Sequence, residues 1–145
     1  MAAKKQSTPQ AIVLAVCQVK RTKDELRSLF ADQIAKGKDI LKRYPSVIYD
    51  QYGRFLLSEQ QEQNYYNEYN AWREFSEEIY TSSFDNPNTK YLEQFQKSAW
   101  SIGIYTGKKG EVYMDSRRCF EKQIAEIDSF LQRLDLIYPQ DNLKS

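Results

Sequence analysis

The most regular hydrophobic pattern of the chain lies between residues 65 and 80, where large apolar side chains recur every three or four positions. Glu68, Glu74, Glu77 and Glu78 lie between them, so the segment has an aromatic face and an acidic face. Ser58 and Gln61 have the spacing of a capping box just before this pattern. We therefore predict a long amphipathic helix that begins after Ser58 and ends near Thr81. Its buried face comprises Tyr65, Tyr69, Trp72, Phe75, Ile79 and Tyr80.

Three other segments show helical periodicity, at residues 23–44, 89–100 and 115–138. Pro45 ends the first because proline disfavours helical geometry in the residue before it, Asn88 can cap the second, and Pro139 follows the third. The predicted buried positions are Leu26, Leu29, Phe30, Ile34 (or Gln33), Gly37, Ile40 and Leu41 in the first, Tyr91, Leu92, Phe95 and Ala99 in the second, and Phe120, Ile124, Ile127, Leu131 and Leu134 in the third. Nearer the N-terminus, Thr8 and Pro9 indicate a helix start, although the β-branched residues that follow also fit a short strand.

Two connections contain large apolar residues and are expected to be ordered. Residues 46–57 predict a lid that folds back on the bundle. Residues 102–114 include Gly103, Gly107 and Gly110 and predict a small β-hairpin or an ordered loop. The fold expected from these elements is all-α, a bundle of four to five helices with this short insert. It forms one helical domain over residues 8–138, between a disordered tail at 1–7 and a polar tail at 139–145.

Composition narrows the classes of protein that fit. With 145 residues the chain can bury a core, and five Gly and four Pro suit long helices better than a sandwich or barrel. No apolar run approaches the roughly 20 residues of a membrane span, so we expect a cytoplasmic protein. Cys17 and Cys119 do not form a disulfide framework, and we expect both to be reduced, with Cys119 on a core-facing helix surface.

The charges are unevenly distributed although the net charge is only +1. Residues 1–43 contain ten Lys and Arg against four acidic residues, whereas residues 58–95 contain eight acidic residues against two basic ones. We interpret this as complementary faces of two antiparallel helices. The alternative is a nucleic-acid-binding protein that uses the basic N-terminal segment, although no recognisable docking motif is present. The residues for that alternative are Lys4, Lys5, Lys20, Arg21, Lys23, Lys42 and Arg43.

Candidate catalytic groups are few. Histidine is absent, which removes histidine acid–base chemistry and most zinc sites. The glutamates at 74, 77 and 78 could gather a divalent cation with Asp85, but a solvated helix face explains them better. Gly103 to Lys109 superficially resembles a phosphate loop, yet only three residues separate its glycines and Lys109 stands where Ser or Thr should bind magnesium. We therefore assign no catalytic, cofactor-binding or metal-binding residue.

The order of the helical motifs resembles a known family. Residues 31–41 form an amphipathic helix with Ile34, Gly37 and Leu41. A Trp-containing helix at 69–75 and the segment 88–95 follow, and the closing helix contains Ile124, Ile127 and Leu131. This order resembles the helical domain often found at the N-terminus of bacterial TIR-like nucleotide-binding and abortive-infection-type proteins. The resemblance covers roughly residues 23–137 and implies a non-catalytic module for assembly or sensing, linked to phage defence. The chain ends where an effector domain would begin in that group, and the insert at 103–110 departs from its pattern.

These observations predict a non-catalytic module for protein–protein interaction or oligomerisation. The working surface we expect is the aromatic set Tyr44, Tyr49, Tyr52 and Phe55, because large aromatic residues on a connecting segment suit a binding patch. The same residues could instead cap the core. Nucleic-acid binding remains one alternative. A small enzyme with a carboxylate-based site is another, and it would need carboxylates with raised pKa values in a concave pocket.

Overall fold

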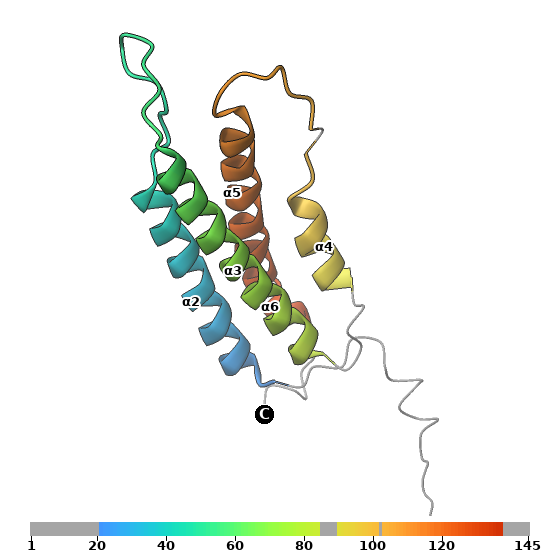
Figure 1. Cartoon of the computed structure of the whole chain (residues 1–145). Helices are drawn as coiled ribbons and strands as arrows, with labels where there is room; N and C mark the ends of the chain where they lie inside the picture. Colours follow the sequence, from blue (N-terminus) through green and yellow to red (C-terminus); the bar gives the residue numbers. More distant parts are fainter. Residues whose placement is uncertain (1–20, 85–89, 102, 138–145) are drawn as a thin grey trace, which may run out of the picture.

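The structure, a computed structural model, describes residues 21–84, 90–101 and 103–137. These residues form five helices, α2 (Lys23–Arg43), α3 (Glu59–Ser83), α4 (Lys90–Ser98), α5 (Glu111–Gln132) and α6 (Leu134–Ile137). In Figure 1, α2, α3, α4 and α5 run alternately up and down, with α5 packed against α2 and α4. The predicted all-α bundle is confirmed. The Thr8 helix start, the Asn88 cap, Cys17, Asp85 and both tails lie outside the described residues.

Capping boxes begin α2 and α3. The Ser58 hydroxyl accepts a hydrogen bond from the Gln61 amide at 3.1 Å, and the Gln61 side chain accepts one from the Ser58 amide at 3.0 Å. This is the box that the sequence predicted. Thr22 and Glu25 form an equivalent box at the start of α2. Both boxes satisfy amide groups that have no partner within the helix, and so they fix where each helix begins.

Aromatic side chains of α3 and α5 make the centre of the core. The Tyr69 and Phe120 rings stack with centroids 4.4 Å apart, and Trp72 lies 4.7 Å from Phe120. The predicted buried face of α3 is confirmed except at Phe75, which is 46% exposed. Ser76 is fully buried instead, because its hydroxyl accepts a hydrogen bond from Gln33 of α2.

A polar contact and a glycine bring α2 close to α3. The Gln33 side chain is 2% exposed and donates to the Ser76 hydroxyl at 2.7 Å, while the Trp72 indole donates to the Gln33 carbonyl at 2.8 Å. Of Ile34 and Gln33, the two residues predicted as alternatives for this buried position, Gln33 is therefore the one that is buried. A Cβ atom at Gly37 would lie 2.9 Å from Ile124 and 3.1 Å from the Trp72 indole nitrogen. The absence of a side chain there permits the close approach of the helices.

Two connections lie at one end of the bundle. Residues 103–109 form an ordered loop, which is one of the two predicted forms, but α5 begins at Glu111, one helical turn earlier than predicted. Strand-like pairing occurs instead in the 46–57 connection, where Tyr49 and Phe55 form an isolated antiparallel bridge. This connection projects beyond the ends of α2 and α3 (Figure 1), and Tyr52 near its tip is 74% exposed. The lid prediction is therefore wrong for the tip of the connection.

The base of the projecting connection is nevertheless fixed to α5. The buried guanidinium of Arg117 donates to the carbonyls of Leu41 and Tyr44, each at 3.1 Å, and so binds the C-terminal end of α2. The Tyr113 hydroxyl donates to the Pro45 carbonyl at 2.6 Å. A cation at this position also interacts favourably with the negative end of the helix dipole.

Candidate interaction surface

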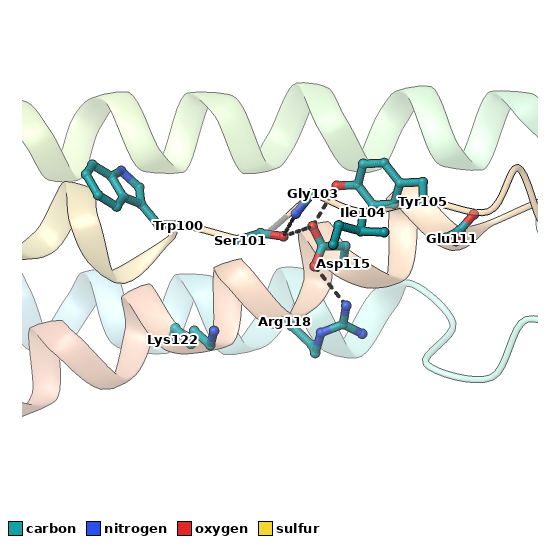
Figure 2. Close-up of a pocket in the computed structure, with 9 residues that line it drawn as sticks. All are labelled: Trp100, Ser101, Gly103, Ile104, Tyr105, Glu111, Asp115, Arg118 and Lys122. Carbon is teal, nitrogen blue, oxygen red and sulfur yellow. Dashed lines mark hydrogen bonds and ion pairs between the residues drawn. The ribbon is translucent and has the colours of Figure 1, made fainter.

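Large apolar side chains are exposed together on the loop that joins α4 to α5. Trp100 is 70% exposed, Ile104 79% and Tyr105 43%. With Arg118 and Lys122 of α5 they line a hollow of about 450 Å³. Figure 2 shows these residues along the segment of loop that runs beside α5. We call the set Trp100, Ile104, Tyr105, Arg118 and Lys122 the α4–α5 surface.

Asp115 holds the first half of this loop against α5. One of its carboxylate oxygens accepts hydrogen bonds from the Ser101 hydroxyl and the Tyr105 hydroxyl, both at 2.7 Å, and the other accepts from Arg118 at 2.8 Å. The three bonds favour the charged form, so they lower the pKa of Asp115, with the Ser101 bond contributing most. The Tyr105 ring is therefore held in place although nearly half of its surface is exposed.

Glu111 holds the second half of the loop. Its carboxylate accepts hydrogen bonds from the amides of Thr106 at 2.6 Å, Gly107 at 2.9 Å and Lys108 at 3.0 Å. These bonds lower the pKa of Glu111, the Thr106 amide being the largest cause. A carboxylate in the first turn of α5 also interacts favourably with the helix dipole. The amides of this glycine-containing segment thus form an anion-binding site that is occupied by the Glu111 carboxylate of the same molecule.

The α4–α5 surface is cationic as well as apolar. The Arg118 side chain is 61% exposed and pairs with Asp115, whose own lone pairs are taken up by the loop. Lys122 is exposed and lies within ion-pair distance of none of the described carboxylates. This arrangement can hold an apolar side chain in the hollow and attract carboxylates at its edge.

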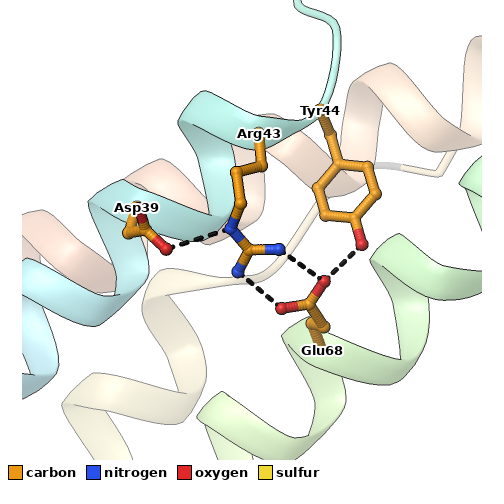
Figure 3. A network of polar contacts seen from close by, with 4 residues as sticks. All are labelled: Asp39, Arg43, Tyr44 and Glu68. Carbon is orange, nitrogen blue, oxygen red and sulfur yellow. Dashed lines mark hydrogen bonds and ion pairs between the residues drawn. The ribbon is translucent and has the colours of Figure 1, made fainter.

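Tyr44, one of the predicted aromatic residues, braces two helices. Its hydroxyl donates to Glu68, and Arg43 donates two hydrogen bonds to the same carboxylate at 2.6 and 2.9 Å (Figure 3). Asp39 accepts a further bond from Arg43 at 3.0 Å. These bonds lower the pKa of Glu68, Arg43 being the first cause. The cluster joins α2 to α3, so Tyr44 has a role within the bundle.

The other predicted aromatic residues lie on the projecting connection. The Tyr49 hydroxyl donates to the Lys109 carbonyl at 2.7 Å, and the Tyr49 and Phe55 ring centroids are 5.6 Å apart. The ammonium groups of Lys108 and Lys109 lie 5.1 and 4.7 Å from the Tyr49 and Phe55 ring centroids. Both rings therefore pack on the neighbouring loop, and of the four predicted residues only Tyr52 is largely exposed.

The predicted nucleic-acid-binding residues that the structure describes lie at opposite ends of α2. Lys23 pairs with Asp135 at 2.5 Å, and Arg21 hydrogen-bonds to the hydroxyls of Ser82 and Ser83. Lys42 and Arg43 lie at the other end of α2, about 30 Å away at 1.5 Å per residue. Lys4, Lys5 and Lys20 lie outside the described residues.

The described carboxylates with a perturbed pKa are all shifted downward, namely Asp50, Glu68, Glu111, Asp115 and Asp135. A carboxylic acid that acts as a general acid needs a raised pKa, and none of these five carboxylates has one. Within the described ranges, no three Cys, Asp or Glu side chains are arranged to hold a metal ion. Cys119 is buried as predicted, and burial raises the pKa of its thiol.

Trp100, Ile104 and Tyr105 were not among the predicted site residues. Ile104 and Tyr105 lie in a segment that has three glycines and no helical period, where large apolar residues have no face to bury. Trp100 was placed at the end of the predicted helix at 89–100, whereas α4 ends at Ser98 and leaves Trp100 exposed on the loop. Large aromatic residues also occur in residues 46–57, and for that reason this connection was the one predicted to bind a partner.

No protein-family model, curated protein or solved structure matches this chain. The resemblance to the bacterial TIR-like and abortive-infection-type helical domain therefore stays a prediction. Across the part of the chain that the structure describes, every helix is too short or too polar to cross a membrane.

Proposed function

We propose that this chain is a non-catalytic protein-binding domain and that the α4–α5 surface is where the partner docks. The observation that carries the proposal is the exposure of Trp100 and Ile104, 70% and 79%, on one ordered loop beside Arg118. Trp, Tyr and Arg are the residue types most enriched at the energetic centres of protein interfaces. A role in bacterial defence remains what the family resemblance implies.

The way in which the loop is held supports this role. Asp115 and Glu111 together accept hydrogen bonds from Ser101, Tyr105 and three loop amides. A loop fixed before binding loses less conformational entropy when a partner docks, so more of the contact energy becomes affinity. The exposed side chains are thus displayed by a preorganised segment.

The charges of the surface define the chemistry of the partner. Arg118 and Lys122 are both exposed at the edge of the hollow. A partner segment that carries an apolar or aromatic side chain flanked by Asp or Glu would satisfy both parts of the surface. A partner segment that is only apolar would give Arg118 and Lys122 no carboxylate, and one that is only acidic would leave Trp100 and Ile104 in water.

A display selection with random peptides tests the proposal. We expect the wild-type protein to enrich peptides with an apolar anchor next to acidic residues. The double variant Trp100→Ala, Ile104→Ser should bind these peptides at least about tenfold more weakly, the effect of losing one interface hot spot. Leu136→Ser is the matched control, because Leu136 is 85% exposed on α6 and away from the hollow.

The selection also has outcomes that contradict the proposal. Peptides that bind the double variant and the wild type equally would show that the docking surface lies elsewhere. Binding of single-stranded oligonucleotides that falls steeply with added salt and with Trp100→Ala would favour a nucleic-acid function over protein binding.

A further inference from the structure

A second surface, on the outer face of α3, has the complementary chemistry. Phe75 is 46% exposed there and lines a hollow with Glu74, Glu77 and Glu78. Of the described Lys and Arg side chains, none lies within ion-pair distance of these three glutamates. The nearest described cation to the ring is Lys36, 6.0 Å from its centroid and already paired with Asp32. We call the set Glu74, Phe75, Glu77 and Glu78 the α3 acidic face.

We propose that the α4–α5 surface of one molecule binds the α3 acidic face of a second copy. This inference rests on the proposed function and names the partner. Phe75 supplies the apolar anchor for the hollow formed by Trp100 and Ile104, and the flanking glutamates supply the carboxylates for Arg118 and Lys122. The contact thus pairs the exposed Phe75 with the exposed Trp100 and neutralises charges that have few partners within one molecule.

The two surfaces cannot meet within one molecule. One is built from the α4–α5 loop and α5, the other from the outer side of α3, and both belong to the same packed bundle. Each copy therefore offers one surface and receives the other, which makes a heterologous, head-to-tail contact. Such contacts generate rings where the rotation closes and open chains where it does not.

The overall charge also favours self-association. The net charge is +1, so two copies hardly repel each other at long range, while the local surfaces carry opposite signs. A protein with a large net charge would have to overcome repulsion before these surfaces met. The inferred contact should therefore weaken when salt screens the local attraction, and it should retain an apolar component that salt does not remove.

A mixing experiment tests the inference. The first variant, Trp100→Ala with Lys122→Glu, disables the α4–α5 surface, and the second, Phe75→Ala with Glu74→Lys, disables the α3 acidic face. Each variant alone should self-associate at least about tenfold more weakly than the wild type in sedimentation velocity. Mixed in equal amounts they should form a 1:1 heterodimer, because the mixture retains one intact copy of each surface.

Controls and refuting outcomes are built into the same experiment. Leu136→Ser and Asp128→Lys change exposed residues outside both surfaces and should associate as the wild type does. Circular dichroism verifies that all variants fold. A wild type that stays monomeric at every concentration, variants that still assemble alone, or a mixture that stays monomeric would each overturn the inference. The peptide selection is independent of these results, so protein binding could be upheld while self-association fails.

Discussion

The hydroxyl of Tyr80 offers a direct test of the core described above. Tyr80 is 1% exposed, and its ring lies 4.7 Å from Phe30 and 5.3 Å from both Phe95 and Phe130, measured between centroids. Among the described residues its hydroxyl is buried without a hydrogen-bond partner. The same burial raises the pKa of Tyr80. The change to make is Tyr80→Phe, which removes only this oxygen.

The expected magnitude follows from two opposing terms. Leaving a buried hydroxyl without a partner costs about 1–3 kcal/mol relative to water. Removing the oxygen also forfeits several dispersion contacts of about 0.1–0.2 kcal/mol each. We therefore expect Tyr80→Phe to increase the free energy of unfolding by about 1 kcal/mol. In thermal unfolding this corresponds to a rise in Tm of a few degrees.

Tyr69→Phe is the matched comparison, because it deletes the same atom at a position where the hydroxyl is bonded. Tyr69 is 5% exposed and donates to the side-chain oxygen of the fully buried Gln123 at 2.6 Å. Its removal leaves that oxygen unpaired and should lower the free energy of unfolding by about 1–2 kcal/mol. Urea denaturation of both variants measures the difference. A Tyr80→Phe protein that loses as much stability as Tyr69→Phe would refute our description of the Tyr80 environment.

Three other predictions concern charge, pH and packing. The hydrogen bonds from the loop amides lower the pKa of Glu111. The stability that the ionised carboxylate gives to the folded protein is therefore fully present above its unfolded pKa of about 4, and it is lost as the pH falls through the lower pKa of the folded state. NMR should show the amide signals of the loop shifting in that acidic range, and signals that change only when the whole bundle unfolds would contradict this. Arg43→Ala should cost at most about 1 kcal/mol in urea denaturation, because its ion pair with Glu68 is partly exposed; a cost above 2 kcal/mol would be too large for such a pair. Gly37→Leu should cost about 1–3 kcal/mol or more through overpacking, whereas Ala35→Leu, exposed on the same helix, should be nearly neutral, and equal effects would show that the space at Gly37 does not matter.

Periodicity and capping predicted the helices because both are local. The Ser58–Gln61 box needs only residues close in sequence, and it occurs where it was expected. Phe75 was wrongly predicted to be buried because a search for apolar periodicity does not detect buried polar residues. Ser76 is buried through its hydrogen bond with Gln33, and the two residues come from different helices. The start of α5 was placed a turn late because three nearby glycines indicate a loop or hairpin.

The interaction surface could not be chosen from the sequence for a related reason. Aromatic residues occur in both connections, and their exposure depends on which connection covers the other. Tyr49 and Phe55 are covered because residues 108–110 pack on them from about 60 positions away. Nothing described packs over Trp100 in the same way. Such long-range choices depend on the assembled fold.

The Glu111 carboxylate also explains why a glycine-rich, lysine-containing segment need not be a receptor for free anions. The three amide groups of the segment already donate hydrogen bonds to the Glu111 carboxylate, which belongs to the same chain. A tethered ligand competes at an effective concentration in the millimolar range or above. Inorganic phosphate or a nucleotide would therefore have to displace the Glu111 carboxylate before it could bind these amides. The anion-binding capacity of the segment thus serves to hold the conformation of its own loop.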